Sequence, residues 1–287
     1  MKNNILVLGA TGMLGHTVYS YLCLKFPNAI FGTTRNNSEF FLLNVDSFEI
    51  DFKLIYKKIG KIDYVINCIG ILNISKDKKE AEKVNAIFPQ KISKYAEKFN
   101  FRLIHVSTDA VFNSQCGKVD ENVTPDPDSF YGKTKLNGEP KNKHAISIRT
   151  SFLGFDWIKH KGLLEWALNS ENDIAGYTNQ AWSGCTTLQF AKLCEFLIKG
   201  DNFDTFRKKS TVLHFSPLGP TKYELLSKFI NLLNKNIQVI KSKSNTPIKR
   251  LLTSVYFDNE FIKNYTTDLG KALSDLIKFE RLEKNEK

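Results

Sequence analysis

The chain has 287 residues, 42% hydrophobic and 25% charged, a balance that excludes disordered and collagen-like classes. This length suits one large or two modest domains, each with its own core. The net charge of +11 does not indicate nucleic-acid binding, because the lysines are interleaved with acids, as in SKDKKEAEK.

The apolar runs are all far shorter than the roughly 20 residues that cross a bilayer, so we expect no membrane span. The start, MKNNILVLGA, runs directly into a strand-like segment and lacks the pattern of a secretory signal, which favours a cytoplasmic protein. The five cysteines are far apart, and the five histidines lack the spacing of a metal site. We therefore expect reduced cysteines and no metal ligands.

Short apolar segments alternate with helical segments through the first half of the chain. This alternation is typical of βαβ units and predicts an α/β fold with a Rossmann-type doubly wound parallel sheet. The expected strands are Ile5–Leu8, Ala29–Thr33, Tyr64–Asn67, Arg102–Val106 and Ala145–Ile148.

One amphipathic helix is expected at Lys78–Phe99, since apolar residues recur there near helical spacing. The residues on its expected buried face are Val84, Ile87, Ile92, Tyr95 and Ala96.

After Arg149 the pattern changes to helices separated by loops rich in Gly, Asn, Thr and Pro. We expect residues 1–150 to form the cofactor-binding domain. Residues 151–287 are expected to form mainly a smaller substrate lobe, with some elements returning to the sheet. A helix is predicted to begin after Pro220. Its expected apolar stripe is Leu225, Leu226, Phe229, Leu232 and Leu233.

Three glycines follow the first expected strand, in the segment ILVLGATGMLG. Glycines between a strand and a helix permit a tight turn and close approach of the backbone to a pyrophosphate, which the helix N-terminus also attracts. This context predicts a dinucleotide site. Its expected contacts are Gly9, Thr11, Gly12, Met13, Leu14 and Gly15.

The second expected strand ends in FGTTRN, without the acidic residue that binds the ribose of NAD. Thr34 and Arg35 stand there instead, and a guanidinium can bind the 2′-phosphate of NADPH. NADPH is therefore the expected cofactor and NADH the less favoured one. The remaining expected cofactor contacts are Asn44, Val45, Cys68, Ile69, Gly70, Asn85, Ser107, Tyr131 and Lys135.

Polar residues Ser107, Thr108 and Asp109 follow the fourth expected strand, at the carboxyl edge where open α/β sheets bind ligands. Tyr131 and Lys135 come later, one helical turn apart, so their side chains share one face of a helix. A nearby ammonium favours the phenolate and should lower the pKa of the tyrosine toward working pH. Thr108 would orient a substrate carbonyl.

Several segments together carry a family resemblance: GATGMLG, DYVINCIG, VNAIFPQKIS, HVSTDAVF, YGKTKLNGE and IRTSFLG. The chain resembles the extended short-chain dehydrogenases/reductases, and most closely the dTDP-4-dehydrorhamnose reductase group of nucleotide-sugar reductases. The resemblance implies hydride delivery from NADPH to C4 of a 4-keto-6-deoxy sugar on a nucleoside diphosphate, for surface polysaccharide biosynthesis. Tyr131 would be the proton donor, Lys135 its partner and Thr108 the hydroxyl residue.

The chain departs from this group at Ala110, where relatives often carry Tyr, and at Phe152, where they often carry Trp. The sugar and the nucleotide therefore stay open, and a UDP-linked N-acetylated sugar fits as well as a dTDP sugar. The expected substrate-binding residues are Thr108, Asp109, Phe152, Asn179 and Trp182. The resemblance is also compatible with a homodimer.

Three other functions use a similar framework. A 4,6-dehydratase is disfavoured, because Ala110 stands where such enzymes carry a glutamate. A nucleotide-sugar epimerase remains open, since it uses similar residues. The third is a non-catalytic NADP-binding regulatory subunit, as in the methionine adenosyltransferase β subunit, which resembles the same reductases.

Overall fold

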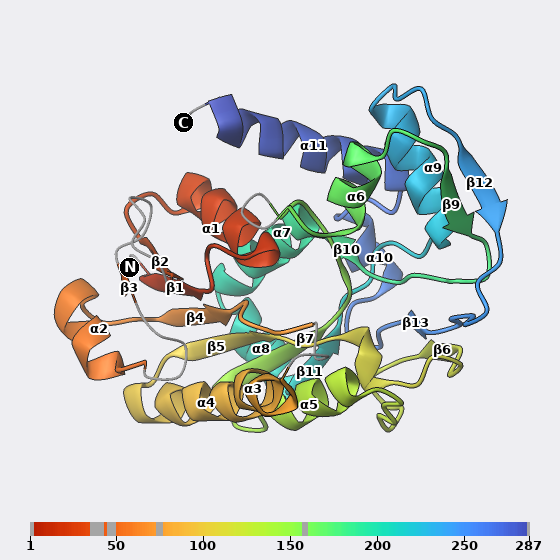
Figure 1. Ribbon diagram of the computed structural model, residues 1–287. Coiled ribbons are helices and arrows are strands. Elements are labelled where there is room, and N and C mark those ends of the chain that lie inside the picture. Colours follow the sequence, from red (N-terminus) through yellow and green to blue (C-terminus); the bar gives the residue numbers. More distant parts are fainter. Residues whose placement is uncertain (1–2, 35–42, 45–49, 73–76, 157–159, 286–287) are drawn as a thin grey trace.

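The computed structural model describes residues 3–34, 43–44, 50–72, 77–156 and 160–285. Within them the central sheet has seven strands, all paired in parallel, in the order β11-β7-β5-β4-β1-β2-β3 (Figure 1). This confirms the predicted α/β class. The strands are β1 (Ile5–Leu8), β2 (Ile30–Thr34), β3 (Leu43–Asn44), β4 (Tyr64–Asn67), β5 (Arg102–Val106), β7 (Ala145–Arg149) and β11 (Val212–His214).

Three of the expected strands have the predicted bounds. The second strand lies one residue further along the chain at both ends, and the fifth is longer by one residue at its carboxyl end. The agreement has a physical cause, because strands covered on both faces read as continuous apolar runs. Every residue of β1, β4 and β7 is buried.

Helices cover both faces of the sheet (Figure 1). On one face lie α1 (Met13–Lys25), α7 (Thr187–Ile198) and α8 (Asn202–Lys209), whose apolar side chains share one core with Ile5 and Val7. On the other lie α2 (Phe52–Ile59), α4 (Phe88–Phe99) and α5 (Phe130–Gly138), and there Leu6, Leu8 and the side chains of α2 and α4 form a second core.

The segment predicted as one helix is helical but changes its winding. It comprises α3 (Lys78–Glu82), the π-helical segment η1 (Lys83–Ile87) and α4. The wider π turn rotates the following residues relative to an α-helix. Asn85 is consequently fully buried, whereas Ile87 is 58% exposed, so its predicted place on the buried face was wrong.

Short strand pairs, which the sequence did not predict, interrupt the second half of the chain. In each pair the strands are parallel. The pairs are β8 (Phe152–Leu153) with β10 (Cys185–Thr186), β9 (Ile174–Tyr177) with β12 (Val239–Ser242), and β6 (Lys118–Val119) with β13 (Leu251–Leu252). The helices here are α6 (Leu163–Asn169), α9 (Lys222–Leu232), α10 (Asn259–Lys263) and α11 (Leu269–Asn285).

Helix α9 begins two residues after Pro220, where Thr221 and Glu224 form a reciprocal capping box. Leu225, Leu226 and Phe229 of the predicted stripe are buried. Leu232 is 37% exposed, so its expected burial was wrong. It is the last residue of the helix, where the stripe leaves the core.

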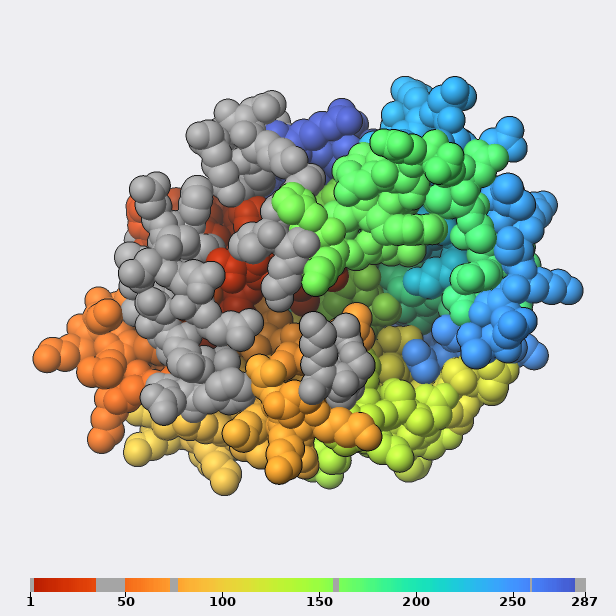
Figure 2. Space-filling view, viewed as in Figure 1, coloured from red at the N-terminus to blue at the C-terminus, as the bar shows by residue number. Residues whose placement is uncertain are grey.

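The carboxyl ends of β4 and β5 point toward the side of the molecule on which β6, β9, β12 and β13 lie (Figure 1). On the face in Figure 2 the surface is hollowed between the lower layer, coloured orange to yellow-green, and the green and blue elements at the upper right.

Helix α5 contacts neighbouring backbone directly, and two glycines permit this. A Cβ on Gly132 would lie 2.0 Å from the carbonyl oxygen of Ala110, which belongs to the 3₁₀ segment η2 (Asp109–Val111). A Cβ on Gly138 would lie 2.0 Å from the carbonyl oxygen of Asn85. The axial position of α5 is therefore fixed against η1 and η2.

We expect Gly138→Ala to destabilise the fold by about 1–3 kcal/mol, because overpacking forces backbone apart. Urea unfolding monitored by circular dichroism measures the change. Gly219→Ala is the control, since a Cβ at Gly219 meets nothing within 4 Å. Equal stability of the two variants would contradict the close packing of α5 on η1.

Candidate active site

The glycine loop has the geometry of a phosphate-binding turn. Gly9 has a φ of 77° and donates its N–H to Thr33 Oγ1 at 3.1 Å. A Cβ on Gly15 would lie 2.1 Å from the carbonyl oxygen of Gly9, so only glycine lets α1 begin this close to β1. Gly12 is exposed at the N-cap, without a side-chain cap. Its surroundings fit a dinucleotide pyrophosphate at a helix N-terminus.

The other expected cofactor residues in this region have different environments. Thr11 and Met13 are partly exposed, whereas Leu14 is packed in the core. Thr34 is also buried, at the end of β2. Arg35 and Val45 lie outside the described residues, and Asn44 is described only as backbone of β3.

The loop after β4 joins the glycine loop to the predicted catalytic helix. A Cβ on Gly9 would lie 2.8 Å from Ile69 Cγ1, and one on Gly70 would lie 3.9 Å from Lys135 Nζ. Cys68 at the start of this loop is partly exposed. The glycine loop, this loop and α5 therefore form one continuous surface.

Asn85 braces that loop from the π-helical segment. Its amide oxygen accepts from the N–H of Ile71 at 2.9 Å, and its amide nitrogen donates to the Ile71 carbonyl at 2.8 Å. The same nitrogen donates to Thr134 Oγ1 in α5 at 3.2 Å. All the polar atoms of this side chain are therefore used in holding the loop against α5.

Thr108, Tyr131 and Lys135 lie together at the carboxyl end of β5. Thr108 is the N-cap of η2; its hydroxyl donates to Asp109 Oδ1 at 3.2 Å and accepts from the N–H of Ala110 at 3.2 Å. The same hydroxyl acts on Tyr131 and lowers its pKa. Tyr131 is partly exposed, whereas Lys135 is only 3% exposed. The three residues thus lie at the carboxyl edge of the sheet, where open α/β folds bind their ligands.

The ionisation of Tyr131 differs from the expectation. Burial raises the pKa of Tyr131 to about 12, the hydrogen bond to Thr108 opposes this, and Asp109 and Arg250 act in opposite directions. Lys135 is not among these influences, because its ammonium donates to the Val106 carbonyl at 2.6 Å. In this structure Tyr131 is a neutral phenol near neutral pH, which is the form that a proton donor needs.

Lys135 is a buried cation with a strongly perturbed pKa. Burial lowers the pKa of Lys135 to about 8, and Glu139 and then Cys68 oppose this shift. Groups with such perturbed pKa values at a sheet edge are typical of functional sites.

Asp109 forms an ion pair that the sequence did not predict. Arg250 Nε donates to Asp109 Oδ2 at 2.8 Å, and Arg250 Nη1 donates to the Phe112 carbonyl at 2.9 Å. Both side chains are largely buried, at 12% and 14% exposure. Asp109, expected to contact substrate, thus ties η2 to the strand β13. No local sequence pattern marks Arg250, since the pairing spans 141 residues.

The remaining expected substrate residues lie in the C-terminal elements. Phe152 in β8 is partly buried, and its ring packs edge-on against Phe190 at 5.2 Å. The amide of Asn179 pairs with the backbone of Ser244 through two hydrogen bonds of 2.8 Å. Trp182 is 6% exposed. Its indole N–H donates to the hydroxyl of Ser151, two residues after Arg149 of β7, at 2.9 Å.

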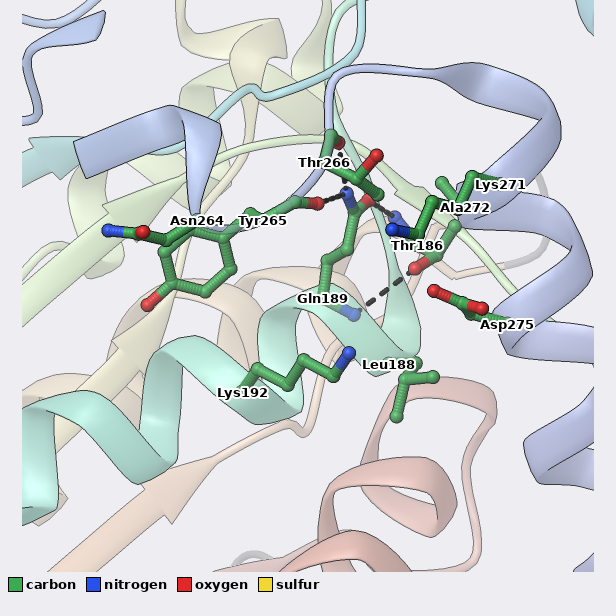
Figure 3. A pocket seen from close by; sticks show the side chains of 10 residues that line it. All are labelled: Thr186, Leu188, Gln189, Lys192, Asn264, Tyr265, Thr266, Lys271, Ala272 and Asp275. Carbon is green, nitrogen blue, oxygen red and sulfur yellow. Dashed lines mark hydrogen bonds between the residues drawn. The ribbon is translucent and has the colours of Figure 1, made fainter. Parts of the chain in front are cut away.

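A separate cavity of about 100 Å³ lies between α7 and the start of α11 (Figure 3). Gln189 lines this cavity, and its Nε2 donates to the carbonyls of Tyr265 and Thr266. Thr108, Tyr131 and Lys135 do not line this cavity. It therefore does not belong to the candidate active site.

The described part of the chain carries neither a cluster of metal-binding side chains nor a membrane-spanning helix. No cluster of three or more His, Cys, Asp or Glu side chains is placed to hold a metal ion. No helix there has the length and apolar character needed to span a membrane.

Comparison with known proteins gives a family match over most of the chain. The model of the RmlD substrate binding domain matches residues 1–269. A dTDP-4-dehydrorhamnose reductase of Mycolicibacterium smegmatis is 28% identical over 53% of this chain and 46% of its own length. The methionine adenosyltransferase 2 subunit beta of Xenopus laevis is 30% identical over 61% of this chain and 54% of its own. The chain thus spans about half the length of these curated relatives.

The fold is also similar to solved structures. The dTDP-4-dehydrorhamnose reductase of Bacillus anthracis, solved in complex with NADP, has a TM-score of 0.74. It is 19% identical, and the match covers 96% of this chain and 98% of that one. The match supports the Rossmann-type arrangement of the sheet and helices.

We expect a double-mutant cycle of Asp109→Asn and Arg250→Gln to give a coupling energy above about 1 kcal/mol, because both charges are largely desolvated. Urea unfolding of the four proteins measures it. The control cycle uses the more exposed pair Lys61–Asp63, whose coupling should stay below about 0.5 kcal/mol. Similar values for both pairs would contradict the proposed tie between η2 and β13.

We expect Lys135→Met to stabilise the protein at pH 7. The pKa of Lys135 is about 8 in the fold, against 10.5 in an unfolded chain, so the unfolded chain binds more protons between these values. The shift corresponds to about 3 kcal/mol. Loss of the hydrogen bond to Val106 offsets roughly 1 kcal/mol of it.

The stabilisation should be complete below pH 8 and should shrink as the pH rises from about 8 to 10.5. Unfolding free energies measured across this range test the sign. Lys133→Met, at an exposed position of the same helix, is the control and should change stability little. A Lys135→Met variant less stable than the native protein at pH 7 would show that the buried ammonium carries no such cost.

Proposed function

The chain belongs to the family of the RmlD substrate binding domain, and from this premise we propose that it is an NADPH-dependent nucleotide-sugar reductase. Its substrate would be a 4-keto-6-deoxy sugar linked to a nucleoside diphosphate, and the reaction a reduction of the C4 ketone. The matched reductase of M. smegmatis supports this reaction class.

One observation carries the proposal. The hydroxyl of Thr108 acts on Tyr131 and lowers its pKa against the effect of burial. Lys135 lies one turn further along α5, with its Nζ 3.9 Å from the Cβ position of Gly70. The loop of Gly70 in turn meets the glycine loop through Ile69 and Gly9. A hydroxyl pair and a cation thus border a surface suited to a dinucleotide, which is the arrangement that carbonyl reduction needs.

In the proposed reaction, NADPH supplies the hydride that reduces the C4 carbonyl. Tyr131, held as a neutral phenol, donates its proton to the developing alkoxide. The hydroxyl of Thr108 orients the carbonyl and stabilises the charge that develops on its oxygen. Lys135, whose ammonium lies beside the loop of Gly70, would hold the nicotinamide ribose of the cofactor.

Several features support NADPH as the cofactor. The exposed N-terminus of α1 suits the pyrophosphate. Gly15 lets the helix begin close to β1, because a Cβ there would lie 2.1 Å from the carbonyl oxygen of Gly9. The absence of an acidic residue in FGTTRN and the presence of Arg35 favour the 2′-phosphate. Catalysis by Thr108, Tyr131 and Lys135 remains a prediction, as do the other cofactor contacts.

The sugar and its nucleotide belong to the same proposal. Phe152 and Ala110 would shape a sugar pocket different from that of rhamnose-type reductases, so dTDP-linked and UDP-linked N-acetylated sugars are both candidates. A role in surface polysaccharide synthesis and a cytoplasmic location complete it.

A second candidate is a non-catalytic NADP-binding subunit. The observation in its favour is the match to the methionine adenosyltransferase 2 subunit beta, which at 30% is more identical to this chain than the matched reductase. The retained set of Thr108, Tyr131 and Lys135 favours the reductase, because a purely regulatory protein has no need of it.

The decisive test follows NADPH absorbance with a panel of dTDP- and UDP-linked 4-keto-6-deoxy sugars. We expect one sugar to be reduced, faster with NADPH than with NADH. Tyr131→Phe should lower kcat by about 100- to 10,000-fold, because the general acid is lost. Tyr177→Phe, at an exposed tyrosine in β9, is the matched control and should keep full activity.

Tight NADPH binding without turnover of any sugar, together with co-purification of a larger enzyme, would favour the regulatory subunit instead. A Tyr131→Phe variant as active as the control would contradict the assignment of the proton donor.

A further inference from the structure

A buried carboxylate lies beneath the candidate active site, at the end of the helix that carries Tyr131 and Lys135. Glu139 directly follows the last residue of α5 and is 4% exposed. Its Oε1 accepts from Ser107 Oγ at 2.6 Å and from Arg149 Nε at 2.8 Å. Its Oε2 accepts from Arg149 Nη2 at 2.8 Å. Such a bidentate pair fixes the orientation of the carboxylate.

Lys135 and Glu139 reach adjacent residues at the end of β5, because Lys135 Nζ donates to the Val106 carbonyl at 2.6 Å and Glu139 Oε1 accepts from Ser107 Oγ. The cluster thus contains two buried cations, Lys135 and Arg149, at 3% and 5% exposure, and one buried carboxylate. Glu139 is already paired with Arg149, so it is a counter-charge that Lys135 shares with Arg149. The ammonium of Lys135 itself donates to the carbonyl of Val106.

We propose that Glu139 is a positioning residue of the active site, which fixes Ser107 and serves as the counter-charge that keeps Lys135 protonated. The inference deepens the proposed reductase function and rests on it for its catalytic consequence. Glu139 would not touch the substrate and would act through Lys135 and Ser107.

The other described ionisable groups near Lys135 are neutral, so Glu139 is its anionic neighbour. His105 in β5 is fully buried, and its pKa is held well below the ordinary value, so it is neutral. Burial raises the pKa of the Cys68 thiol to about 12, so it is also neutral. Tyr131 is a neutral phenol. Among the described groups that act on Lys135, only Glu139 therefore carries a negative charge.

Two rings lie beside Arg149, the cation that is paired with Glu139. His214 in β11 approaches Arg149 Nη1 at 3.4 Å, and burial lowers the pKa of His214, so it adds no charge near neutral pH. The ring of Phe112 lies 5.2 Å from the guanidinium of Arg149 on another side. Arg149 is thus the cation paired with Glu139, and Lys135 is the second buried cation on which Glu139 acts.

The test measures the protonation of Lys135 directly, by NMR of lysine side chains labelled with carbon-13 and nitrogen-15 in the full-length protein. The Lys135→Arg variant identifies the resonance by its absence. We expect Glu139→Gln to move the titration midpoint of Lys135 down by about one pH unit, because a neighbouring opposite charge is lost. Glu165→Gln, at another glutamate that is 2% exposed, is the matched control and should leave the midpoint unchanged.

A second variant separates charge from packing. Arg149→Gln also breaks the buried ion pair, but we expect the midpoint of Lys135 to stay or to rise, because Glu139 then serves Lys135 alone. A merely structural role predicts the same direction of shift in both variants. If either single variant fails to fold, the double variant Glu139→Gln with Arg149→Gln leaves neither member of the pair charged, and it should lower the midpoint as Glu139→Gln does.

An unchanged midpoint in Glu139→Gln, or a fall in Arg149→Gln, would overturn the inference. Because the titration needs no substrate, it is independent of whether the reductase proposal holds. In the reductase assay, Glu139→Gln should move the alkaline limb of the kcat/KM profile to lower pH, in step with the NMR midpoint. An alkaline limb that does not move would contradict the catalytic part alone.

Discussion

The close contact of α5 with the backbone of η1 and η2 is the constraint on which the site depends. Gly132 and Gly138 face carbonyl oxygens at distances that no side chain would tolerate, so the helix can take only one axial position. That position sets where Tyr131 and Lys135 meet Thr108 at the end of β5. A helix displaced by a single methyl group would separate the phenol from the threonine hydroxyl, because packed interiors do not deform smoothly.

The same contact determines the charge environment of Lys135. A helix lying this close to the sheet buries Lys135 and Glu139 together against Arg149. Burial alone destabilises the ammonium, which is why the pKa of Lys135 is about 8 rather than 10.5. Glu139 opposes the shift, so the cation persists near neutral pH. The site therefore combines a large desolvation with one well-placed counter-charge, the usual means by which a fold keeps a buried lysine ionised.

The sequence predicted the frame of the fold better than the contacts within the site. Strands such as Tyr64–Asn67 are buried on both faces and read as continuous apolar runs, so their bounds could be found locally. Ile87 was misplaced because a π turn depends on tertiary packing and has no period of its own. The sequence showed that Tyr131 and Lys135 are one helical turn apart. It could not show that the ammonium of Lys135 points to the carbonyl of Val106. Arg250 was missed because its partner Asp109 is far away in the sequence.

The π turn of η1 explains both the wrong prediction for Ile87 and the position of Asn85 beside the site. The π turn that exposes Ile87 also turns Asn85 inward, where its amide holds the loop of Gly70 against α5. An ordinary α-helix would present a different residue at that point and leave the backbone of Ile71 without its partner. Extra π turns are energetically poor and persist where a function depends on them. The irregular winding of η1 is thus best understood as the means by which the helix reaches the loop that borders the cofactor surface.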